Sequence, residues 1–147
     1  MDILLIEKEH PLWEKTAAFA QSCSWRAGIF LAERMQKNSF QDWERVIIAA
    51  EQDTIAGFCT LTEQDELPAD AGISPFIGFV FVDVRYLGNR LSEQMIRHAL
   101  RYAKEIGYQT VYIMSGEQGL YEKYGFEMIG DRETIYGTTD QLFRFTL

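Results

Sequence analysis

The sequence predicts an α/β fold, on the strength of two stretches. Phe76–Val84 reads FIGFVFVDV, a nearly unbroken apolar run typical of a strand buried on both faces. After a glycine turn, apolar residues recur at helical spacing over Leu91–Ile106, and Thr110–Met114 is a second strand. A strand, a helix and a strand joined in this way form a parallel, right-handed unit. Upstream, Arg45–Thr62 holds two β-rich runs around a short polar turn, which predicts an antiparallel hairpin.

The N-terminal part predicts one strand and two helices. Met1–Ile6 is a short apolar strand that opens the sheet, and the spacing of apolar residues over Pro11–Ser22 predicts a helix. A second helix is expected around Phe30–Met35, fraying into the polar residues 36–39. At the other end, residues 127–131 form a short strand or turn, and residues 141–147 alternate as a half-buried final strand.

Composition limits the class of protein. The chain has 147 residues, of which 47% are hydrophobic, which fits a single domain over residues 1–147. No apolar run approaches the roughly 20 residues of a membrane span, and no basic leader opens the chain. We therefore expect a soluble, uncleaved, cytoplasmic protein without a membrane partner.

Charge and cysteine content restrict the partners. The formal net charge of -8 repels a nucleic-acid backbone and favours a basic or amine-bearing substrate. Cys23 and Cys59 lie in apolar sequence without metal spacing, so we expect two buried free thiols and no metal. His10 and His98 have no partner at metal or triad spacing and are expected to be structural.

A glycine within a strand and a long polar loop are two further features of the sequence. Gly57, within the second run of the hairpin, indicates either a bulge or a close approach of another backbone. Residues 63–75 form a polar loop that we expect to be mobile. Its acids form either an acidic mouth for a cationic amine or a solvated surface without a specific role. They are Glu63, Asp65, Glu66 and Asp70.

The glycine turn at Gly88 leads from a strand into a helix. Backbone N–H groups at a helix N-terminus are free to bind an anion, and the helix dipole favours negative charge there. The turn is therefore either an anion cradle or a simple connection that needed a glycine. It matches neither the dinucleotide-binding fingerprint nor a phosphate loop.

Two motifs in this region resemble the acetyl-CoA-binding core of the GNAT superfamily of N-acetyltransferases. They are VDVRYLGNRLS at Val82–Ser92 and LYEKYGF at Leu120–Phe126, and strand order and composition agree from about Val46 to the C-terminus. The resemblance implies an α+β version of the fold: a mixed, mostly antiparallel, twisted sheet of about six to seven strands with about four helices. One parallel strand pair is splayed to admit the pantetheine arm. Residues 76–126 would form the acetyl-CoA core, and residues 1–40 the substrate side.

The resemblance also assigns cofactor contacts. Main-chain amides of the turn would hold the CoA pyrophosphate, and a backbone N–H near Phe81 and Val82 would hold the acetyl carbonyl. The family pattern Gln/Arg-x-x-Gly-x-Gly/Ala is degenerate here, because Leu87 stands at its first position and Arg90 and Ser92 replace its glycines. The expected turn residues are Leu87, Gly88, Asn89, Arg90, Leu91 and Ser92.

Tyr121 stands where the family places its general acid. A phenol is protonated at neutral pH and can donate to a departing thiolate, whereas the alternative role is packing. The general base stays open, and Asp83 is expected instead to cap the turn. Conceivable acceptors are Asp83, Glu63, Asp65, Glu66 and Glu133. An asparagine that the family often has seven residues before the tyrosine is Met114 here.

Large aromatic side chains in the N-terminal part have two readings. In the resembled family this part covers the substrate, so Trp13, Trp25 and Phe30 would be pocket walls. Ordinary core packing is the favoured reading, because large aromatics dominate core burial.

The resemblance implies an enzyme that moves an acetyl group from acetyl-CoA to a primary amine of a small molecule or peptide by direct transfer. The alternative is a CoA-binding or ligand-sensing protein with little turnover, and a third reading is an interaction protein that has lost CoA. Polyamines, aminoglycosides and protein N-termini are all compatible with the acidic composition. The sequence leaves the oligomeric state open, and a homodimer is among the states it allows.

Overall fold

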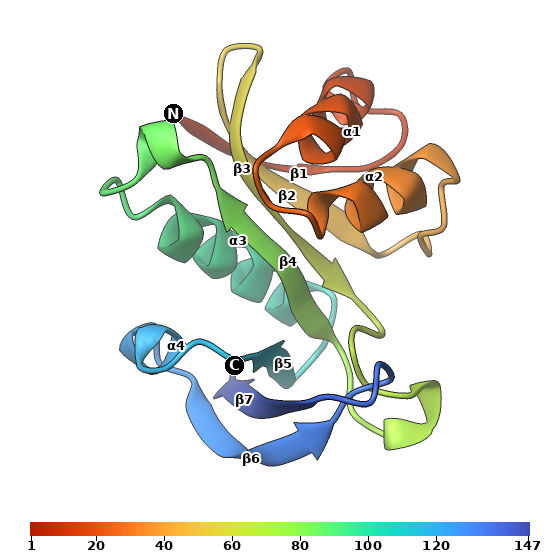
Figure 1. The fold of residues 1–147 in the computed structure, drawn as a ribbon, viewed down its shortest axis with the longest axis vertical. Helices are drawn as coiled ribbons and strands as arrows, with labels where there is room; N and C mark the ends of the chain where they lie inside the picture. Colours follow the sequence, from red (N-terminus) through yellow and green to blue (C-terminus); the bar gives the residue numbers. More distant parts are fainter.

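The computed structural model describes residues 1–147 as one seven-stranded sheet in the order β1-β2-β3-β4-β5-β7-β6, with helices on both faces (Figure 1). The strands are β1 (Asp2–Ile6), β2 (Arg45–Glu51), β3 (Thr54–Thr62), β4 (Phe76–Val82), β5 (Thr110–Ser115), β6 (Glu127–Glu133) and β7 (Thr139–Thr146). The α-helices are α1 (Trp13–Ser22), α2 (Gly28–Gln36), α3 (Leu91–Glu105) and α4 (Leu120–Lys123). Short 3-10 turns cover Ala69–Ala71 and Val84–Tyr86.

The sheet is mixed. Every neighbouring pair of strands is antiparallel except β4 and β5, which are parallel. The predicted hairpin is the β2–β3 pair, and the predicted strand-helix-strand unit is β4–α3–β5. Both predictions and the expected mixed, mostly antiparallel sheet are therefore confirmed.

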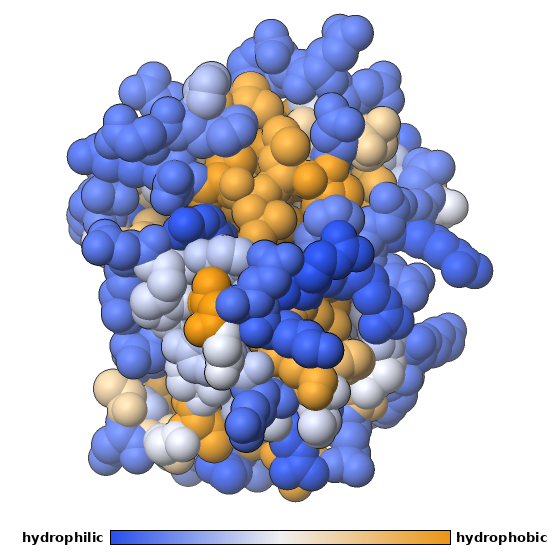
Figure 2. All heavy atoms as spheres, turned by 180° about the vertical axis from the view of Figure 1, so that it is seen from behind, coloured by the Kyte–Doolittle hydropathy of each residue, from blue (hydrophilic) through white to orange (hydrophobic).

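Two cores lie on opposite faces of the sheet. The helices α1 and α2 cover one face and α3 covers the other (Figure 1). Viewed from behind, the surface shows an apolar patch bordered by hydrophilic residues (Figure 2). The six buried positions of α3 face the sheet, which confirms the predicted amphipathic helix. They are Leu91, Met95, Ile96, Ala99, Leu100 and Ala103.

Gly57 permits a close approach between β3 and β4. A Cβ atom there would lie 2.6 Å from the Phe81 carbonyl oxygen, and the β2–β3 register shifts between Ala49 and Ala50 beside it. Both readings of this glycine are therefore confirmed. No helix in the structure has the length and apolar character needed to cross a membrane.

Several element boundaries differ from the prediction. The first helix begins at Trp13 and not at Pro11, because the Leu12 N–H donates to His10 Nδ1 at 3.0 Å and holds the preceding residues in a turn. The short helix α4 spans the four residues Leu120–Lys123. Gly119 before it adopts φ +82°, a left-handed conformation that an α-helix cannot contain.

The expectation that the Phe76–Val84 stretch is buried on both faces is wrong for its second half. Phe76, Ile77 and Gly78 are buried, but the last four residues of β4 are half-exposed because β5 diverges from them. The strand ends at Val82, where Asp83 accepts a hydrogen bond from the Arg85 N–H at 3.0 Å. The predicted capping role of Asp83 is confirmed.

The two cysteines differ. Cys59 is fully buried in the core beneath α3, and burial raises the pKa of its thiol. Cys23 is half-buried, and its thiol lies 3.3 Å from the Ala20 carbonyl oxygen, so the expectation of burial is wrong for this residue. His98 Nδ1 lies 2.8 Å from the Gln94 carbonyl oxygen within α3, as expected of a structural histidine.

Candidate active site

A cleft opens between β4 and β5. The two strands are paired at Phe76 and Tyr112 and separate beyond that point, because the chain after β4 turns toward α3. The resulting cavity has a volume of about 710 Å³. It is lined by β4, β5, the turn before α3, the α4 segment and the loop after β3. This is the splayed parallel pair expected from the resemblance.

One end of the cleft is a row of free amides. No N–H group from Gly88 to Glu93 donates a hydrogen bond within the chain, and the first such donor in α3 is Gln94, whose N–H bonds to the Arg90 carbonyl at 3.0 Å. Gly88 and Arg90 adopt φ of +88° and +55°, which turns this segment into the helix N-terminus. Free amides at a helix N-terminus form an anion site.

Most of the predicted cofactor residues line this cleft. The lining ones are Val82, Leu87, Gly88, Arg90, Leu91 and Ser92. Phe81 and Asn89 do not line it: the Phe81 ring stacks on Trp25, and the Asn89 side-chain amide donates to the Tyr86 carbonyl at 3.0 Å.

The Val82 N–H points into the cleft. The next amide, that of Asp83, donates to the Ala56 carbonyl at 2.8 Å on the β3 side. Successive amides along a strand point to opposite edges, so the Val82 amide faces the β5 side and the Phe81 amide faces β3. Of the two amides expected to hold the acetyl carbonyl, the structure brings only that of Val82 to the cleft.

A bulge interrupts β4 at Phe79 and Val80, before Val82. The β3–β4 register shifts between Phe58 and Thr60, and Phe79 adopts φ +50°. Such a φ is uncommon outside glycine and bends the strand locally. The bulge leaves Phe79 and Val80, both lining residues, unpaired with β3 beside the opening.

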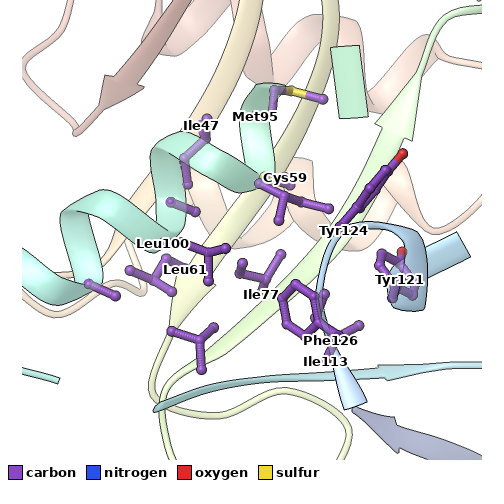
Figure 3. Packing of buried hydrophobic residues seen from close by; sticks show 14 of the residues in the cluster. Ile47, Cys59, Leu61, Ile77, Met95, Leu100, Ile113, Tyr121, Tyr124 and Phe126 are labelled. Atoms are coloured by element: carbon purple, nitrogen blue, oxygen red, sulfur yellow. The ribbon is translucent and has the colours of Figure 1, made fainter. Parts of the chain in front are cut away.

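Tyr121 lines the middle of the cleft from α4. The residue is 5% exposed, and its ring packs against Tyr124 and Phe126, which are labelled beside it in Figure 3. The ring also packs against Phe143. Burial raises the pKa of the phenol, and a hydrogen bond with the Ser115 side chain partly offsets that effect. The phenol is therefore protonated at neutral pH.

Three carboxyl groups lie at the other end of the cleft, those of Asp65, Glu66 and Asp140. The other conceivable bases lie elsewhere: Glu63 binds the Gln41 amide at 2.6 Å, and Glu133 is exposed on β6. Asp83 faces Arg85, whose hydrogen bonds hold its pKa below the usual range. The five alternatives are thus reduced to Asp65 and Glu66, and the structure adds Asp140 and Glu117, which also line the cleft.

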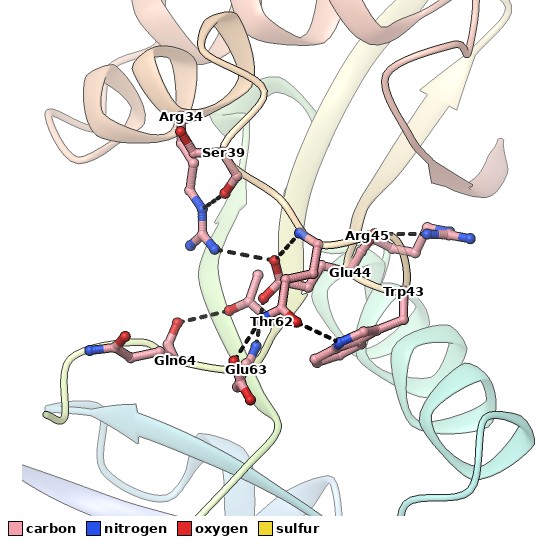
Figure 4. A network of polar contacts seen from close by, with 9 residues as sticks. Arg34, Ser39, Trp43, Glu44, Arg45, Thr62, Glu63 and Gln64 are labelled. Atoms are coloured by element: carbon pink, nitrogen blue, oxygen red, sulfur yellow. Dashed lines mark hydrogen bonds and ion pairs between the residues drawn. The ribbon is translucent and has the colours of Figure 1, made fainter. Parts of the chain in front are cut away.

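A buried carboxylate fixes where the loop with Asp65 begins. Glu44, 4% exposed, accepts hydrogen bonds at 2.7 Å from the N–H groups of Gln41 and Glu63 (Figure 4). Arg34 lies 3.6 Å from the same carboxylate. Leu67, 2% exposed, anchors the loop further along in a small apolar cluster with Phe76. The loop is held at both of these points.

The surroundings keep two of the acids partly protonated. Burial raises the pKa of Asp65 to about 6, and the Arg34 charge opposes that rise. Burial, together with a hydrogen bond to the Asp140 carboxyl, raises the pKa of Glu66 to about 8. Two carboxyl groups that share a hydrogen bond need a proton between them, so this cluster holds at least one proton near neutral pH.

Comparison with known proteins identifies the family. The family model described as Acetyltransferase (GNAT) family matches residues 9–126. The chain belongs to the GNAT acetyltransferase family. It is an acetyl-CoA-dependent acetyltransferase, which accounts for the amide row and the splayed strands. No curated protein matches the sequence.

Solved structures share this GNAT fold. Aminoglycoside 6'-acetyltransferase type Ii aligns with a TM-score of 0.77 at 18% identity, covering 99% of this chain and 97% of that one. An aminoglycoside 6'-N-acetyltransferase complexed with coenzyme A aligns with a TM-score of 0.74 at 15% identity, with the same coverage. A GNAT family acetyltransferase from Elizabethkingia anophelis with acetyl-CoA bound aligns with a TM-score of 0.66 at 16% identity over 99% and 97%.

The turn of this GNAT chain fits a pyrophosphate despite its substitutions. Binding there uses main-chain donors, and all six amides from Gly88 to Glu93 remain free. Ser92 replaces a glycine, but its hydroxyl lies 2.8 Å from the Tyr124 hydroxyl and so faces α4 instead of filling the cradle. No group of three or more His, Cys, Asp or Glu residues is arranged to hold a metal ion.

Two aromatic residues correct the favoured prediction of core packing. Trp25 and Phe30 line the cleft and are 36% and 65% exposed, so they are pocket walls, whereas Trp13 is 6% exposed and belongs to the core. Trp25 lies in the loop between α1 and α2, and Phe30 lies in the first turn of α2.

Some site residues were missed by sequence reasoning. Asp140 comes from β7, far along the chain from Asp65, and only the pairing of β5 with β7 brings it to the cleft. Gly78 and Gly116 lie under the carboxyl groups of Asp65 and Asp140, respectively. A glycine inside an otherwise β-branched and aromatic strand was the available signal for Gly78.

Proposed function

We propose that this GNAT enzyme transfers the acetyl group of acetyl-CoA directly to a primary amine, with Tyr121 as general acid. The observation that carries the proposal is one cleft with free amides at one end, the protonated phenol of Tyr121 in the middle and ionisable carboxyl groups at the other end. An anion site, an acid and a base are the parts this reaction needs.

Each residue has a defined task. Acetyl-CoA supplies the acetyl group as a thioester, and we assign its pyrophosphate to the amides of Gly88 to Ser92. The Val82 N–H, which faces the cleft, is the donor for the acetyl carbonyl oxygen. Asp65 or Glu66 accepts a proton from the substrate ammonium, which frees the amine to attack. These assignments place the phosphate, acetyl and amine groups along a single opening.

Tyr121 gives its proton to the departing sulfur. A raised pKa opposes proton release from the phenol, but the same desolvation raises the pKa of a thiol in the cleft. Desolvation therefore raises the proton affinity of the phenolate of Tyr121 and of the departing thiolate together. The substrate ammonium loses two protons in all, sulfur keeps one, and solvent returns the proton to Tyr121.

The solved structures support an amine substrate. Two of the structures with the same fold are aminoglycoside acetyltransferases by their names, and aminoglycosides carry primary amines. The net charge of -8 also favours a cationic substrate over an anionic one. We infer a small-molecule amine as the acceptor.

A CoA-binding or ligand-sensing protein with little turnover is the second candidate. Leu87 and Met114 favour it, since they replace the polar residues found at these positions in the family. Calorimetric titration with acetyl-CoA and with CoA, followed by turnover with primary amines, separates the two. Micromolar binding with acetylated product supports the enzyme, binding without product supports the sensor, and absence of binding to the folded protein contradicts both.

A further inference from the structure

We propose that Asp65, Glu66 and Asp140 form a subsite for a substrate with at least two ammonium groups, one acetylated and one held. This inference rests on the proposed function and names the substrate class. Linear polyamines and aminoglycosides share that chemistry.

The backbone on both sides of the cleft makes room for these carboxyl groups. A Cβ at Gly78 on β4 would lie 2.6 Å from Asp65 Oδ1, a distance at which one of the two groups must move. A Cβ at Gly116, directly after β5, would lie 3.6 Å from Asp140 Oδ1. Each of the two diverging strands thus has a glycine, within it or directly after it, where a carboxyl group approaches its backbone. The carboxyl groups of Asp65 and Asp140 therefore lie in the gap between β4 and β5.

Glu66 contributes an oxygen without a partner. Its Oε2 atom is buried and receives no hydrogen bond from an amide, hydroxyl or cationic group of the chain. The backbone that carries it is fixed, because the Glu66 carbonyl accepts a hydrogen bond from the Ile135 N–H at 2.7 Å. A buried carboxylate oxygen without a donor is costly, and an ammonium group in the cleft supplies that donor.

No cation of the chain neutralises the cluster. None of the ion pairs includes Asp65, Glu66 or Asp140. Arg34 on α2 acts on Asp65 through its charge, but its guanidinium pairs with Glu44 at 3.6 Å and donates to the Ser39 carbonyl at 3.0 Å. A cationic ligand would therefore meet carboxyl groups that no ion pair of the chain already occupies.

Aromatic rings surround the same end of the cleft. Trp25, Phe30 and Tyr136 line it and are 36%, 65% and 72% exposed. Trp25 is held in place by stacking on Phe81, with ring centroids 6.0 Å apart and an interplanar angle of 5°. Ammonium groups are attracted to aromatic faces as well as to carboxylates. The aromatic side chains and the carboxyl groups of the cleft therefore favour the same kind of ligand.

A matched pair of amines tests the proposal. We would compare kcat/KM for 1,4-diaminobutane and n-butylamine, which have the same carbon chain and differ in the second ammonium group. A charge-assisted hydrogen bond to that group predicts a preference of about tenfold or more for the diamine. Spermidine and kanamycin, tested in parallel, distinguish a linear polyamine from an aminoglycoside as the preferred form. Equal values for the two matched amines would overturn the inference.

Single substitutions test which side chains cause the preference for 1,4-diaminobutane over n-butylamine. Asp140→Asn and, separately, Glu66→Gln should reduce the diamine-to-butylamine ratio toward one, with acetyl-CoA binding as the measure of folding. Asp131→Asn removes the same charge from the neighbouring strand β6, where the residue is exposed and outside the cleft, and should keep the ratio. If both cleft variants keep the wild-type ratio, the carboxyl groups are not the subsite. If the wild type binds acetyl-CoA and acetylates neither amine nor either polyamine, the proposed function itself fails.

Binding of the diamine should also release protons. The cluster holds a proton near neutral pH, and a second ammonium group nearby displaces it. Calorimetry in buffers of different ionisation enthalpy measures that release. Release near pH 7 in the wild type that is absent in Glu66→Gln is the expected result, and equal release in both proteins would contradict the assignment to Glu66.

Discussion

The carboxyl group of Asp65 rests against Gly78, so closely that a methyl group at this glycine would lie 2.6 Å from Asp65 Oδ1. The contact joins the loop after β3 to the bulged part of β4. It places a carboxyl group at the point where the sheet opens, beside Phe79 with its φ of +50°. Because Gly78 has no side chain, it leaves space in the cleft for the carboxyl group of Asp65.

Replacing Gly78 with alanine should therefore lower activity while the cofactor end is kept. The added methyl group displaces the Asp65 carboxyl, and we expect kcat/KM for 1,4-diaminobutane to fall about tenfold or more, the effect of misplacing a positioned group. Acetyl-CoA affinity, measured by calorimetry, should change little. Gly116→Ala is the matched comparison, since its methyl group would lie at an ordinary 3.6 Å from Asp140. An equal loss in both variants would argue against the Asp65 contact as the cause.

Tyr121→Phe removes the proposed acid and keeps the ring that packs in the core. We expect kcat to fall by about 10² or more, the usual contribution of a general acid, with the Kd for acetyl-CoA unchanged. Steady-state kinetics and calorimetry provide the two measurements. Tyr108→Phe removes a phenol outside the cleft and should leave kcat as it is. Wild-type turnover in the Tyr121 variant would eliminate this residue as the acid.

Much of the fold was readable from local sequence. The period of apolar residues predicted α3 within one residue of its observed end, and the apolar runs located β2 to β5. Strand ends and short helices were less accurate, because they depend on single contacts such as that of His10 with the Leu12 amide. The resemblance supplied the mixed, mostly antiparallel sheet with one splayed parallel pair, which local patterns do not contain.

Asn89→Pro tests the amide row. Proline lacks the N–H, and we expect acetyl-CoA to bind about tenfold more weakly or worse, as the loss of a hydrogen bond to a charged group predicts. Asn89→Ala keeps the amide and removes the side-chain bond to the Tyr86 carbonyl, so it separates the two effects. Calorimetric Kd values that are the same for the alanine and proline variants would contradict an anion site built from this amide.

Stability should fall as the pH rises. Both raised pKa values, about 6 for Asp65 and about 8 for Glu66, favour the neutral acid in the folded state. In the unfolded chain these groups ionise near pH 4, so their contribution is complete below about pH 4 and is lost as the pH rises through 6 and then 8. The charges of Arg34 and Asp140 also act on Asp65, and both residues are present in the wild type and in the Glu66→Gln variant that is compared with it.

Urea unfolding measures this effect. The free energy of unfolding should decrease between about pH 5 and about pH 9, and Glu66→Gln should lose less of it in the upper part of that range. Asp65 and Asp140 interact with Glu66, so the difference reports the loss of Glu66 together with its effect on these two neighbours. A decrease of the same size in the variant would show that Glu66 ionises normally in the folded state.

The site was only partly predictable, for a physical reason. Tyr121 and the turn lie in contiguous motifs whose chemistry is local, so they were assigned from the sequence. The carboxyl cluster unites residues from the loop after β3 and from β7, and nothing in their spacing along the chain indicates that they meet. Of the five conceivable bases, the structure removes three by their distance from the cleft or their own partners.

The most direct test of acetyl transfer is the stoichiometry of its products. The enzyme is incubated with acetyl-CoA and 1,4-diaminobutane, spermidine or kanamycin, and mass spectrometry quantifies free CoA and acetylated amine. Transfer predicts equal amounts of the two, both reduced by about 10² or more in Tyr121→Phe. Bound acetyl-CoA with no acetylated product, or CoA released without acetylated amine, would contradict acetyl transfer to an amine.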